Sequence, residues 1–186
     1  MKKLLGILFL SLFAFSLVQA ESQLPECKGK KADKWSDCHG IRKSSYGHKY
    51  VGEFLNGKFH GQGTFIYKGR KYVGQYKNHK RHGQGTYNYA NGDKYIGEWK
   101  NHKYHGKGVY IYSNGDQYVG EWKKNKYNAP DNLSEREGYG IYTYNNGNEY
   151  VGEWKKGKKH GKGILSYANG EIEEGMWKKN ELVEIK

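Results

Sequence analysis

The chain contains little of the aliphatic material from which most protein cores are built. Only 35% of its 186 residues are hydrophobic, and it has two methionines and two prolines. After residue 20, no stretch is apolar enough to span a membrane, and no useful window shows the 3.6-residue period of an amphipathic helix. We therefore expect essentially no helix after residue 20, and a core that is not mainly aliphatic.

The sequence also lacks recognisable catalytic machinery. No glycine-rich phosphate loop precedes a helix, no nucleophile lies in a recognisable elbow, and the paired carboxylates of glycoside hydrolases are not evident. We therefore expect no enzymatic activity, no cofactor and no small-molecule substrate. Four glutamates recur at one position of a repeat, where we interpret them as partners of lysines such as Lys100 and Lys155: Glu53, Glu98, Glu121 and Glu153.

The one long apolar run lies at the N-terminus. Two lysines precede a run from Leu4 to Val18, and small residues follow as far as Ala20. This pattern is typical of a secretory signal peptide, residues 1–20, that is cleaved after Ala20. An uncleaved membrane anchor is the alternative, but the run is short for a bilayer span of about 20 residues. We expect an exported protein, in the periplasm or outside the cell.

Cysteine is scarce, with Cys27 and Cys38 as the only two residues of this type. In an exported chain an even number of cysteines at close spacing suggests a disulfide. That bond would attach the segment around Trp35 to the first strand as a cap. A metal pair is the alternative, but the eleven-residue separation and the lack of further cysteines disfavour it.

Positive charge dominates. Removal of Lys2 and Lys3 with the signal peptide leaves 30 lysines and arginines against 19 acidic residues, a net charge of +11. Such a charge favours contact with anionic lipid headgroups, polyanionic glycans or nucleic acid. Solubility is the other interpretation, because the lysines recur in every repeat. Export disfavours nucleic acid as the partner.

A repeat is the most informative feature of the chain. Tyr-x-Gly-x-aromatic pentads begin at Tyr50, Tyr72, Tyr95, Tyr118 and Tyr150, at steps of 22, 23, 23 and 32 residues. Each pentad is followed by Gly-x-Gly, and most are followed by an Asn-Gly pair. Self-similarity at such a period indicates a repeat array with an extended surface.

The third repeat, 95–117, shows what each unit forms. Its two halves alternate with a period of two, which is the signature of β-strands. Asn114-Gly115 at its end predicts a type I′ turn, which needs positive φ at both central residues. We therefore predict an all-β fold: an elongated, single-sheet antiparallel meander of successive β-hairpins, with eleven or twelve strands.

Glycines inside strands indicate close contact with aromatic rings. We expect Gly97 and Gly108 to leave room for tyrosine and tryptophan rings from neighbouring strands. The tryptophans would then form a buried row, although an exposed binding stripe is the alternative. The repeat positions that we assign a structural role are Tyr50, Gly52, Tyr72, Gly74, Tyr95, Gly97, Trp99, Tyr118, Gly120, Trp122, Tyr150, Gly152, Trp154 and Trp177.

This pattern resembles the membrane occupation and recognition nexus (MORN) repeat, in an exported bacterial form. The resemblance covers Tyr50 to about Lys178 and implies contact with a protein or with a membrane surface. It is carried by the five Gly-x-Gly pairs and by YVGEF (50–54), YVGQY (72–76), YIGEW (95–99), YVGEW (118–122) and YVGEW (150–154).

The units divide the chain as follows. An N-terminal cap with a degraded half-repeat occupies 21–49, the array occupies 50–180, and a C-terminal tail occupies 181–186. The fourth unit contains an insertion, 125–137, that is either a tolerated loop or a specificity element. Within the array the units are 50–71, 72–94, 95–117, 118–149, 150–172 and a partial unit, 173–180.

Histidines are numerous but widely spaced. Four of them precede a Gly-x-Gly pair, and successive copies should lie two strands, about 9–10 Å, apart. That distance is too large for two imidazoles to share a metal ion, so we expect no metal site. We interpret these residues as polar turn residues, with a pH-sensitive row as the alternative: His60, His82, His105 and His160.

The sequence therefore favours a non-enzymatic binding or scaffold protein that contacts a protein partner or an anionic membrane or glycan surface. A docking or delivery accessory of a secreted effector enzyme is the alternative. Binding of an anionic or phosphoinositide-like lipid is compatible with the composition. The sequence does not indicate an oligomeric state.

Overall fold

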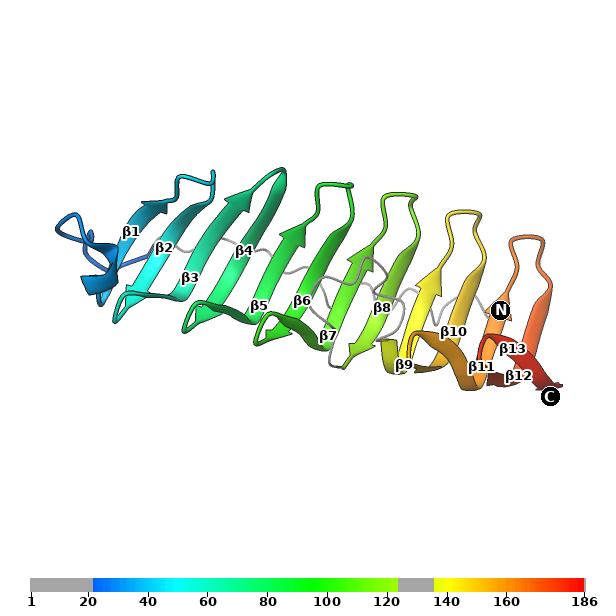
Figure 1. Ribbon diagram of the computed structural model, residues 1–186. Coiled ribbons are helices and arrows are strands. Elements are labelled where there is room, and N and C mark those ends of the chain that lie inside the picture. The colour runs from blue at the N-terminus through cyan, green and yellow to red at the C-terminus, as the bar shows by residue number, and fades with distance from the viewer. Residues whose placement is uncertain (1–21, 124–135, 186) are drawn as a thin grey trace.

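A computed structural model describes residues 22–123 and 136–185 as one antiparallel sheet, in which every strand pairs with its neighbours in chain order (Figure 1). This confirms the predicted all-β meander. The only helical element in the described part of the chain is a 3-10 turn, η2, Ala32–Lys34. The strands are β1 Cys38–Lys43, β2 Lys49–Leu55, β3 Lys58–Tyr67, β4 Arg70–Lys77, β5 Lys80–Asn88, β6 Lys94–Lys100, β7 Lys103–Ile111, β8 Gln117–Trp122, β9 Arg136–Thr143, β10 Glu149–Lys155, β11 Lys158–Ser166, β12 Ile172–Lys178 and β13 Glu181–Ile185.

The sheet has thirteen strands, one or two more than the repeat count predicted. The additional strand is β13, which forms from residues expected to be a tail. It pairs with β12 through Met176 opposite Glu184 and Trp177 opposite Leu182. The partial unit therefore completes a hairpin, and the sheet continues almost to the end of the chain.

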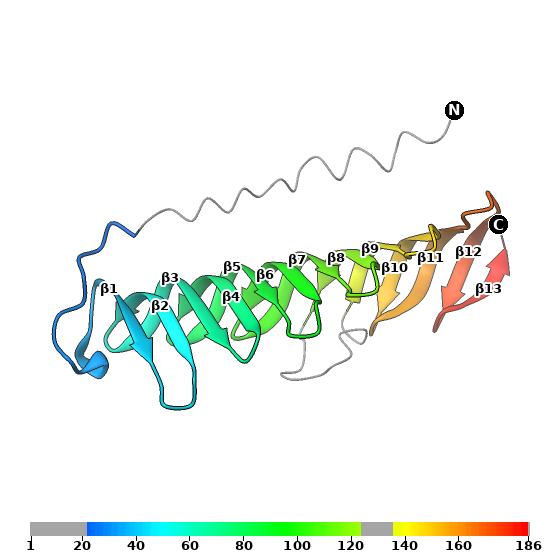
Figure 2. The ribbon, with the colours of Figure 1, turned by 90° about the horizontal axis from the view of Figure 1, so that it is seen from above.

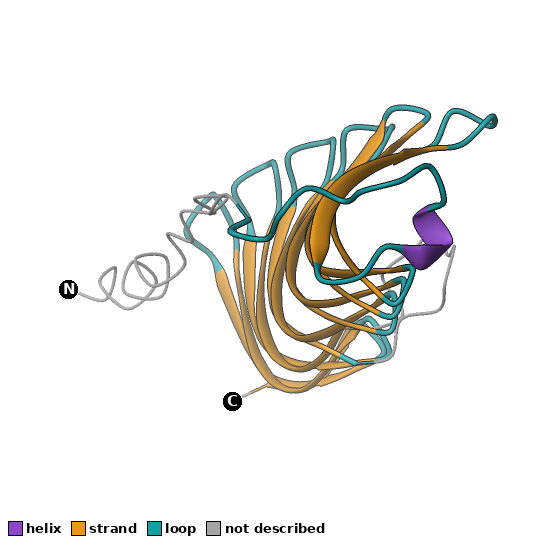
Figure 3. Cartoon of the chain, turned by 90° about the vertical axis from the view of Figure 1, so that its left-hand side faces the viewer, coloured by secondary structure: helices purple, strands orange, loops and turns teal. Residues whose placement is uncertain are grey.

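A row of glycines crosses the sheet at right angles to the strands. Gly52 lies opposite both Gly40 and Gly63, and the same pairing continues strand by strand as far as Gly175. Because the residues of this row have no side chains, the sheet can bend along it and aromatic rings can lie directly on its backbone. Viewed along its long axis, the sheet is a deep trough (Figure 3). We call the tyrosine- and tryptophan-bearing face the inner face, and the opposite face the outer face.

β-bulges sharpen this bend. In the hairpin of β6 and β7, Gly97 lies opposite Gly108 but Glu98 lies opposite His105, so Gly106 and Lys107 are extra residues. Gly106 has φ 55°, a backbone conformation that favours glycine. The first glycine of each Gly-x-Gly pair is therefore a bulge residue, and the second glycine belongs to the row.

The turns differ from the prediction. In the loop after β5, only Gly92 of the Asn91-Gly92 pair has positive φ, at 93°, and Asn91 Oδ1 accepts a hydrogen bond from the Asp93 N–H. Type I′ geometry is found instead inside the units whose central turn is described, as at Asn101-His102, with φ of 52° and 69°, and between the first two units at Lys68-Gly69. In the Asn91-Gly92 loop, the Tyr89 N–H donates to the Asp93 carbonyl, and this bond closes the loop around residues 90–92. The Asn-Gly loops are therefore longer than the two residues of a type I′ turn.

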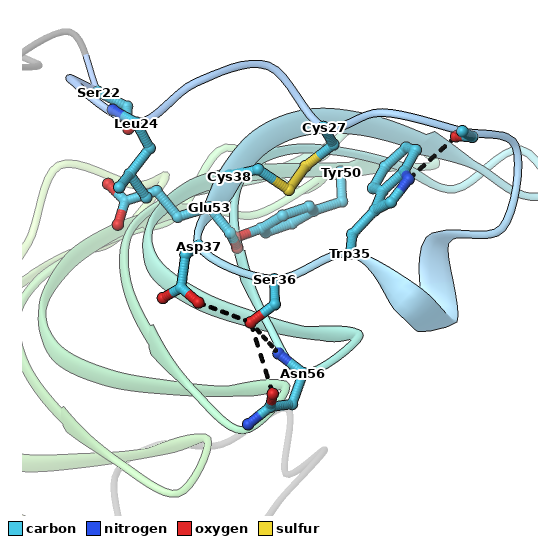
Figure 4. Close-up of a disulfide and its surroundings, with 11 residues drawn as sticks. Ser22, Leu24, Cys27, Trp35, Ser36, Asp37, Cys38, Tyr50, Glu53 and Asn56 are labelled. Carbon is cyan, nitrogen blue, oxygen red and sulfur yellow. Dashed lines mark hydrogen bonds between the residues drawn. A yellow bond between two sulfur atoms is a disulfide. The ribbon is translucent and has the colours of Figure 1, made fainter.

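The N-terminal segment caps the first strand. Cys27 and Cys38 form a disulfide (Figure 4). The residues on both sides of Glu26 hydrogen-bond with the backbone of His39 on β1. Trp35 packs edge-on against Phe54 at 4.9 Å between ring centroids. The cap and β13 therefore lie at opposite ends of the sheet (Figure 2).

Candidate binding surface

The tyrosines of the pentads lie flat on the glycine row. The ring of Tyr95 extends along its own strand, and its hydroxyl donates to the Glu98 carbonyl at 3.0 Å. A Cβ placed on Gly108 would lie 2.4 Å from the Tyr95 Oη. For Gly108 on β7 the ring thus comes from the neighbouring strand β6, as expected, whereas Gly97 lies beneath a ring of its own strand. Burial raises the pKa of Tyr95 far above its ordinary value.

The tryptophans form a second buried row beside the tyrosines. Tyr95 contacts Trp99 and Trp122 edge-on, at 5.2 and 5.5 Å between ring centroids. The Trp122 indole is 2% exposed, and its Nε1–H donates to the Gly108 carbonyl at 3.1 Å. Because this row is buried, it is not available as a binding stripe. The same burial and the same bond to a glycine carbonyl occur at Trp99, Trp154 and Trp177.

A third inner-face position was missed by the sequence analysis. It is the residue opposite each aromatic that ends a pentad, and we call it the stacking position. Tyr104 stacks parallel on Tyr95 at 3.6 Å. Cations replace rings in other units, and the Arg136 guanidinium lies 4.3 Å from the Trp154 ring centroid. The stacking positions are Phe59, Arg81, Tyr104, Arg136 and Lys159.

The variety at this position explains why no pattern revealed it. An aromatic ring and an arginine share the property of a flat surface that can lie on another ring. Burial lowers the pKa of the Arg136 guanidinium, while the surrounding tyrosines oppose that shift. Three of the chain's cations therefore pack on core rings, Arg136 buried and Arg81 and Lys159 partly buried, and contribute less to an accessible basic surface than the exposed lysines.

The repeated glutamates have a backbone role. Glu98 Oε1 accepts a hydrogen bond from the Lys107 N–H at 2.9 Å, across the bulge that contains Gly106. Glu153 makes the equivalent bond to the Lys162 N–H, and Gln75 shows that an amide serves equally well. These carboxylates thus satisfy bulge amides, where the sequence analysis had assigned them to lysine side chains.

One rim of the trough carries a row of exposed lysines. The type I′ turns inside the units lie along this rim, at the lower edge of the sheet in Figure 1, whereas the turn of the same geometry at Lys68-Gly69 lies on the opposite rim. In three hairpins the turn is flanked by lysines that lie directly opposite one another, for example Lys100 and Lys103. Successive hairpins lie about 9–10 Å apart. We define the lysine rim as Lys58, Lys77, Lys80, Lys100, Lys103, Lys155 and Lys158, all of which are exposed.

Turn residues connect the hairpins along the lysine rim. The His102 N–H donates to the Arg81 carbonyl at 3.0 Å, and His102 Nδ1 accepts from the Arg81 N–H at 3.3 Å. Asn180 makes the same pair of bonds with Lys159. Burial, followed by the charges of Arg81 and Lys80, lowers the pKa of His102 to about 4. The imidazole is therefore a neutral acceptor at neutral pH.

The opposite rim contains the Asn-Gly loops, in which aspartate carboxylates accept hydrogen bonds from the next unit. Asp93 accepts from the Tyr110 hydroxyl at 2.6 Å and from the Ser113 N–H at 2.8 Å, which joins one loop to the next unit. Burial alone would raise the pKa of Asp93, but these hydrogen bonds lower it. Asp116 makes equivalent bonds to Tyr142 and the backbone of Asn145. This rim is therefore more neutral than the lysine rim.

Other expected features add no second site. No group of three or more histidine, cysteine, aspartate or glutamate side chains within 22–123 and 136–185 could hold a metal ion. No helix within these ranges is long and apolar enough to cross a membrane. The predicted signal peptide and nearly all of the 125–137 insertion lie outside the described residues.

Comparison with known proteins identifies the repeat. The family model of the MORN repeat matches more than half of the chain, at 50–69, 72–94, 95–117, 118–128, 134–149 and 150–172. A search among curated proteins gives no match. The TCP domain of SAS-4 (dCPAP) from Drosophila melanogaster, solved with a proline-rich motif of Ana2 (dSTIL), is 11% identical with a TM-score of 0.32. That alignment covers 75% of this chain and 90% of the other.

Proposed function

Because the chain belongs to the MORN repeat family, whose members are generally not enzymes, we propose that it is an exported binding scaffold that contacts an anionic surface through its lysine rim. One observation carries the proposal: lysines flank the type I′ turns of successive hairpins along one rim and are all exposed. The periplasm or the extracellular space remains the proposed location, supported by the apolar run at the N-terminus.

The inner face offers little to a partner. Its tyrosine and tryptophan rows are buried, and their hydroxyl and indole groups donate to backbone carbonyls. An aromatic platform for bases or sugars needs accessible ring faces. Contact with a partner is therefore left to the rims, the outer face and the two ends of the sheet.

The lysine rim is arranged at a cost to stability. Lys77 lies opposite Lys80, and Lys155 lies opposite Lys158, in positions where like charges repel. A glutamate on either strand would relieve the repulsion, as at Lys178 opposite Glu181 in the last hairpin. Repetition of the unfavourable pair in three hairpins supports selection for binding. Rows of charge of one sign raise the local concentration of an anionic partner and accelerate association.

Co-sedimentation with lipid vesicles tests this proposal. The variant Lys77→Gln/Lys80→Gln/Lys100→Gln/Lys103→Gln removes four charges from the rim. We expect wild type to sediment with anionic vesicles at low salt, to be released at high salt, and to ignore neutral vesicles. The rim variant should lose most of this binding.

A matched variant separates rim binding from general attraction. Lys43→Gln/Lys71→Gln/Lys107→Gln/Lys162→Gln removes the same number of charges from exposed sites away from the lysine rim. We expect it to bind nearly as well as wild type. Equal losses in the two variants would show that net charge, not the rim, attracts the protein, and no binding by wild type would remove the anionic-surface proposal.

A further inference from the structure

The two ends of the sheet are finished differently. At the first strand, the His39 N–H donates to the Pro25 carbonyl and the Cys27 N–H donates to the His39 carbonyl, at 2.8 and 2.9 Å. The disulfide holds this segment in place. At the other end, β13 pairs with β12, and no other described strand lies beside it. An uncovered edge strand presents free backbone donors and acceptors to another chain.

Apolar side chains gather beside this uncovered edge. Six of the ten exposed large hydrophobic residues lie between Tyr139 and Ile185, including Val183, which is 57% exposed on β13 itself. A shallow groove of about 580 Å³ reaches β13 from the outer face. Exposed apolar patches of this kind mark contact sites. The apolar lining of the groove is Tyr139, Val151, Ile164, Met176 and Ile185.

Acidic side chains border the groove at the edge. On the outer face, Ile164 of β11 lies opposite Glu174 of β12, and Met176 of β12 lies opposite Glu184 of β13. Residues 171–185 contain five glutamates and two lysines, in a chain whose net charge is strongly positive. The groove lining itself contains two glutamates and one lysine, Lys162. The end of the sheet is therefore mainly acidic and apolar, whereas the lysine rim is basic.

We propose that β13 and the adjacent groove form a docking site for an extended peptide segment of a partner protein in which apolar and basic residues alternate. The segment adds to the sheet as a further antiparallel strand, and its backbone pairs with the free edge of β13. Because side chains of a strand alternate between faces, its basic residues lie on the outer face beside Glu184, where their aliphatic stems cover the apolar groove, and its apolar residues lie on the inner face beside Leu182. This site is independent of the lysine rim.

Charge decides among possible occupants. A second copy that paired through the same edge would bring two sets of glutamates together around β13, where like charges are unfavourable. An edge-to-edge pairing with β1 of another copy meets the segment that already occupies His39. A basic, extended segment of another protein meets neither obstacle.

Fluorescence anisotropy with a labelled peptide of alternating lysine and valine tests the site. We expect saturable binding to wild type and little binding of a peptide of alternating glutamate and valine. Glu184→Lys should weaken binding of the lysine peptide by about tenfold or more. Val183→Pro should abolish it, because proline cannot take part in ladder pairing yet is tolerated on an edge strand.

A matched pair of substitutions controls for general charge effects. Met176 and Ile66 are exposed outer-face residues with 37% and 39% exposure, at opposite ends of the sheet. Met176→Lys should weaken the complex, and Ile66→Lys should not. Hydrogen exchange gives a second readout, since amides of β13 should become protected only when the lysine peptide is present.

Three outcomes overturn the inference. Equal binding by wild type and Val183→Pro would show attraction without strand addition. Equal losses in Met176→Lys and Ile66→Lys would place the peptide elsewhere. A concentration-dependent dimer that Val183→Pro dissociates would assign the edge to a second copy of the chain. The rim variant with four glutamines should still bind the lysine peptide, so that failure of this site and failure of the lysine rim are distinguishable.

Discussion

The indole Nε1–H of Trp122 donates a hydrogen bond to the carbonyl oxygen of Gly108, 3.1 Å away and fourteen residues earlier in the chain. The bond connects the last residue of one hairpin's first strand to the glycine row of the preceding hairpin. The other three pentad-position tryptophans make the same bond. Each unit that carries a tryptophan is therefore attached to the one before it by a buried polar contact as well as by rings. This is the nearest-neighbour coupling on which a repeat protein's stability depends.

The glycine row should tolerate no side chain beneath a tyrosine. In Gly108→Ala the new Cβ would lie 2.4 Å from the Tyr95 Oη, so the ring must move and its bond to Glu98 is lost. We expect a loss of about 1–3 kcal/mol or more in the free energy of unfolding, as for other overpacked sites. Urea denaturation followed by tryptophan fluorescence measures it.

Gly170→Ala is the control for that substitution. Gly170 has φ 95° but nothing within 4 Å of an added Cβ. Its cost should be limited to backbone strain of about 1–2 kcal/mol. If the alanine at position 108 proves less harmful than the alanine at 170, the close packing of Tyr95 on the glycine row is not what stabilises the hairpin.

Arg136 should be replaceable by an aromatic residue but not by alanine. Its guanidinium lies within 5.2 Å of the ring centroids of Tyr118, Tyr142 and Trp154, and the side chain is buried. Arg136→Ala should cost about 2 kcal/mol or more, because it removes a desolvated cation–π contact and leaves a cavity. Thermal melting measures the loss.

The chain itself supplies the rescue variant. Tyr104 occupies the same stacking position two strands earlier, so Arg136→Tyr should recover most of the stability that Arg136→Ala loses. A melting temperature for Arg136→Ala equal to that of wild type would contradict the assigned role of the guanidinium.

Acid should destabilise the junction between hairpins at His102. The folded-state pKa of about 4 lies below the ordinary value of 6.5, so the unfolded chain binds a proton that the folded chain does not. The contribution of His102 to stability is therefore complete above pH 6.5 and declines as the pH falls from about 6.5 towards 4. The free energy of unfolding, measured across this range, should decrease accordingly.

His102→Asn should remove this part of the pH dependence without loss of stability at pH 7. Asn180 shows that an amide oxygen accepts the same backbone hydrogen bond at the equivalent turn, at 2.8 Å. His82 also has a lowered pKa, through burial and nearby positive charges, so some pH dependence will remain. Superimposable pH profiles of the variant and wild type would show that His102 does not titrate as assigned.

The period of the pentads was enough to predict the meander, because each unit alternates with a period of two and ends in turn residues. How the sheet bends at its β-bulges was harder to predict from the sequence. Nothing in the spacing reveals that Gly106 is a bulge residue, or that the Tyr95 ring covers Gly97 of its own strand as well as Gly108 of the neighbouring strand. Asn-Gly pairs suggested two-residue turns, but Asp93 needs a longer loop to reach Tyr110 in the next unit.

The binding surface shows a second limit of prediction from the sequence. The charge of the chain is visible in its composition, but the separation of partly buried cations such as Arg81 from exposed ones such as Lys80 is not. That separation depends on which side of the sheet each residue faces after the bulge. The stacking position accepts rings and cations alike, so it carries no residue pattern that a sequence reading could detect.

The unfolding curve of Trp122→Ala tests most directly the central claim that the aromatic rows are the core, which leaves binding to the rims and the ends. The substitution removes a ring that is 2% exposed and leaves the Gly108 carbonyl without its indole donor. We predict a decrease of about 3–5 kcal/mol in the free energy of unfolding. A curve that overlays that of wild type would contradict the claim and make the tryptophan row the leading candidate for the binding surface.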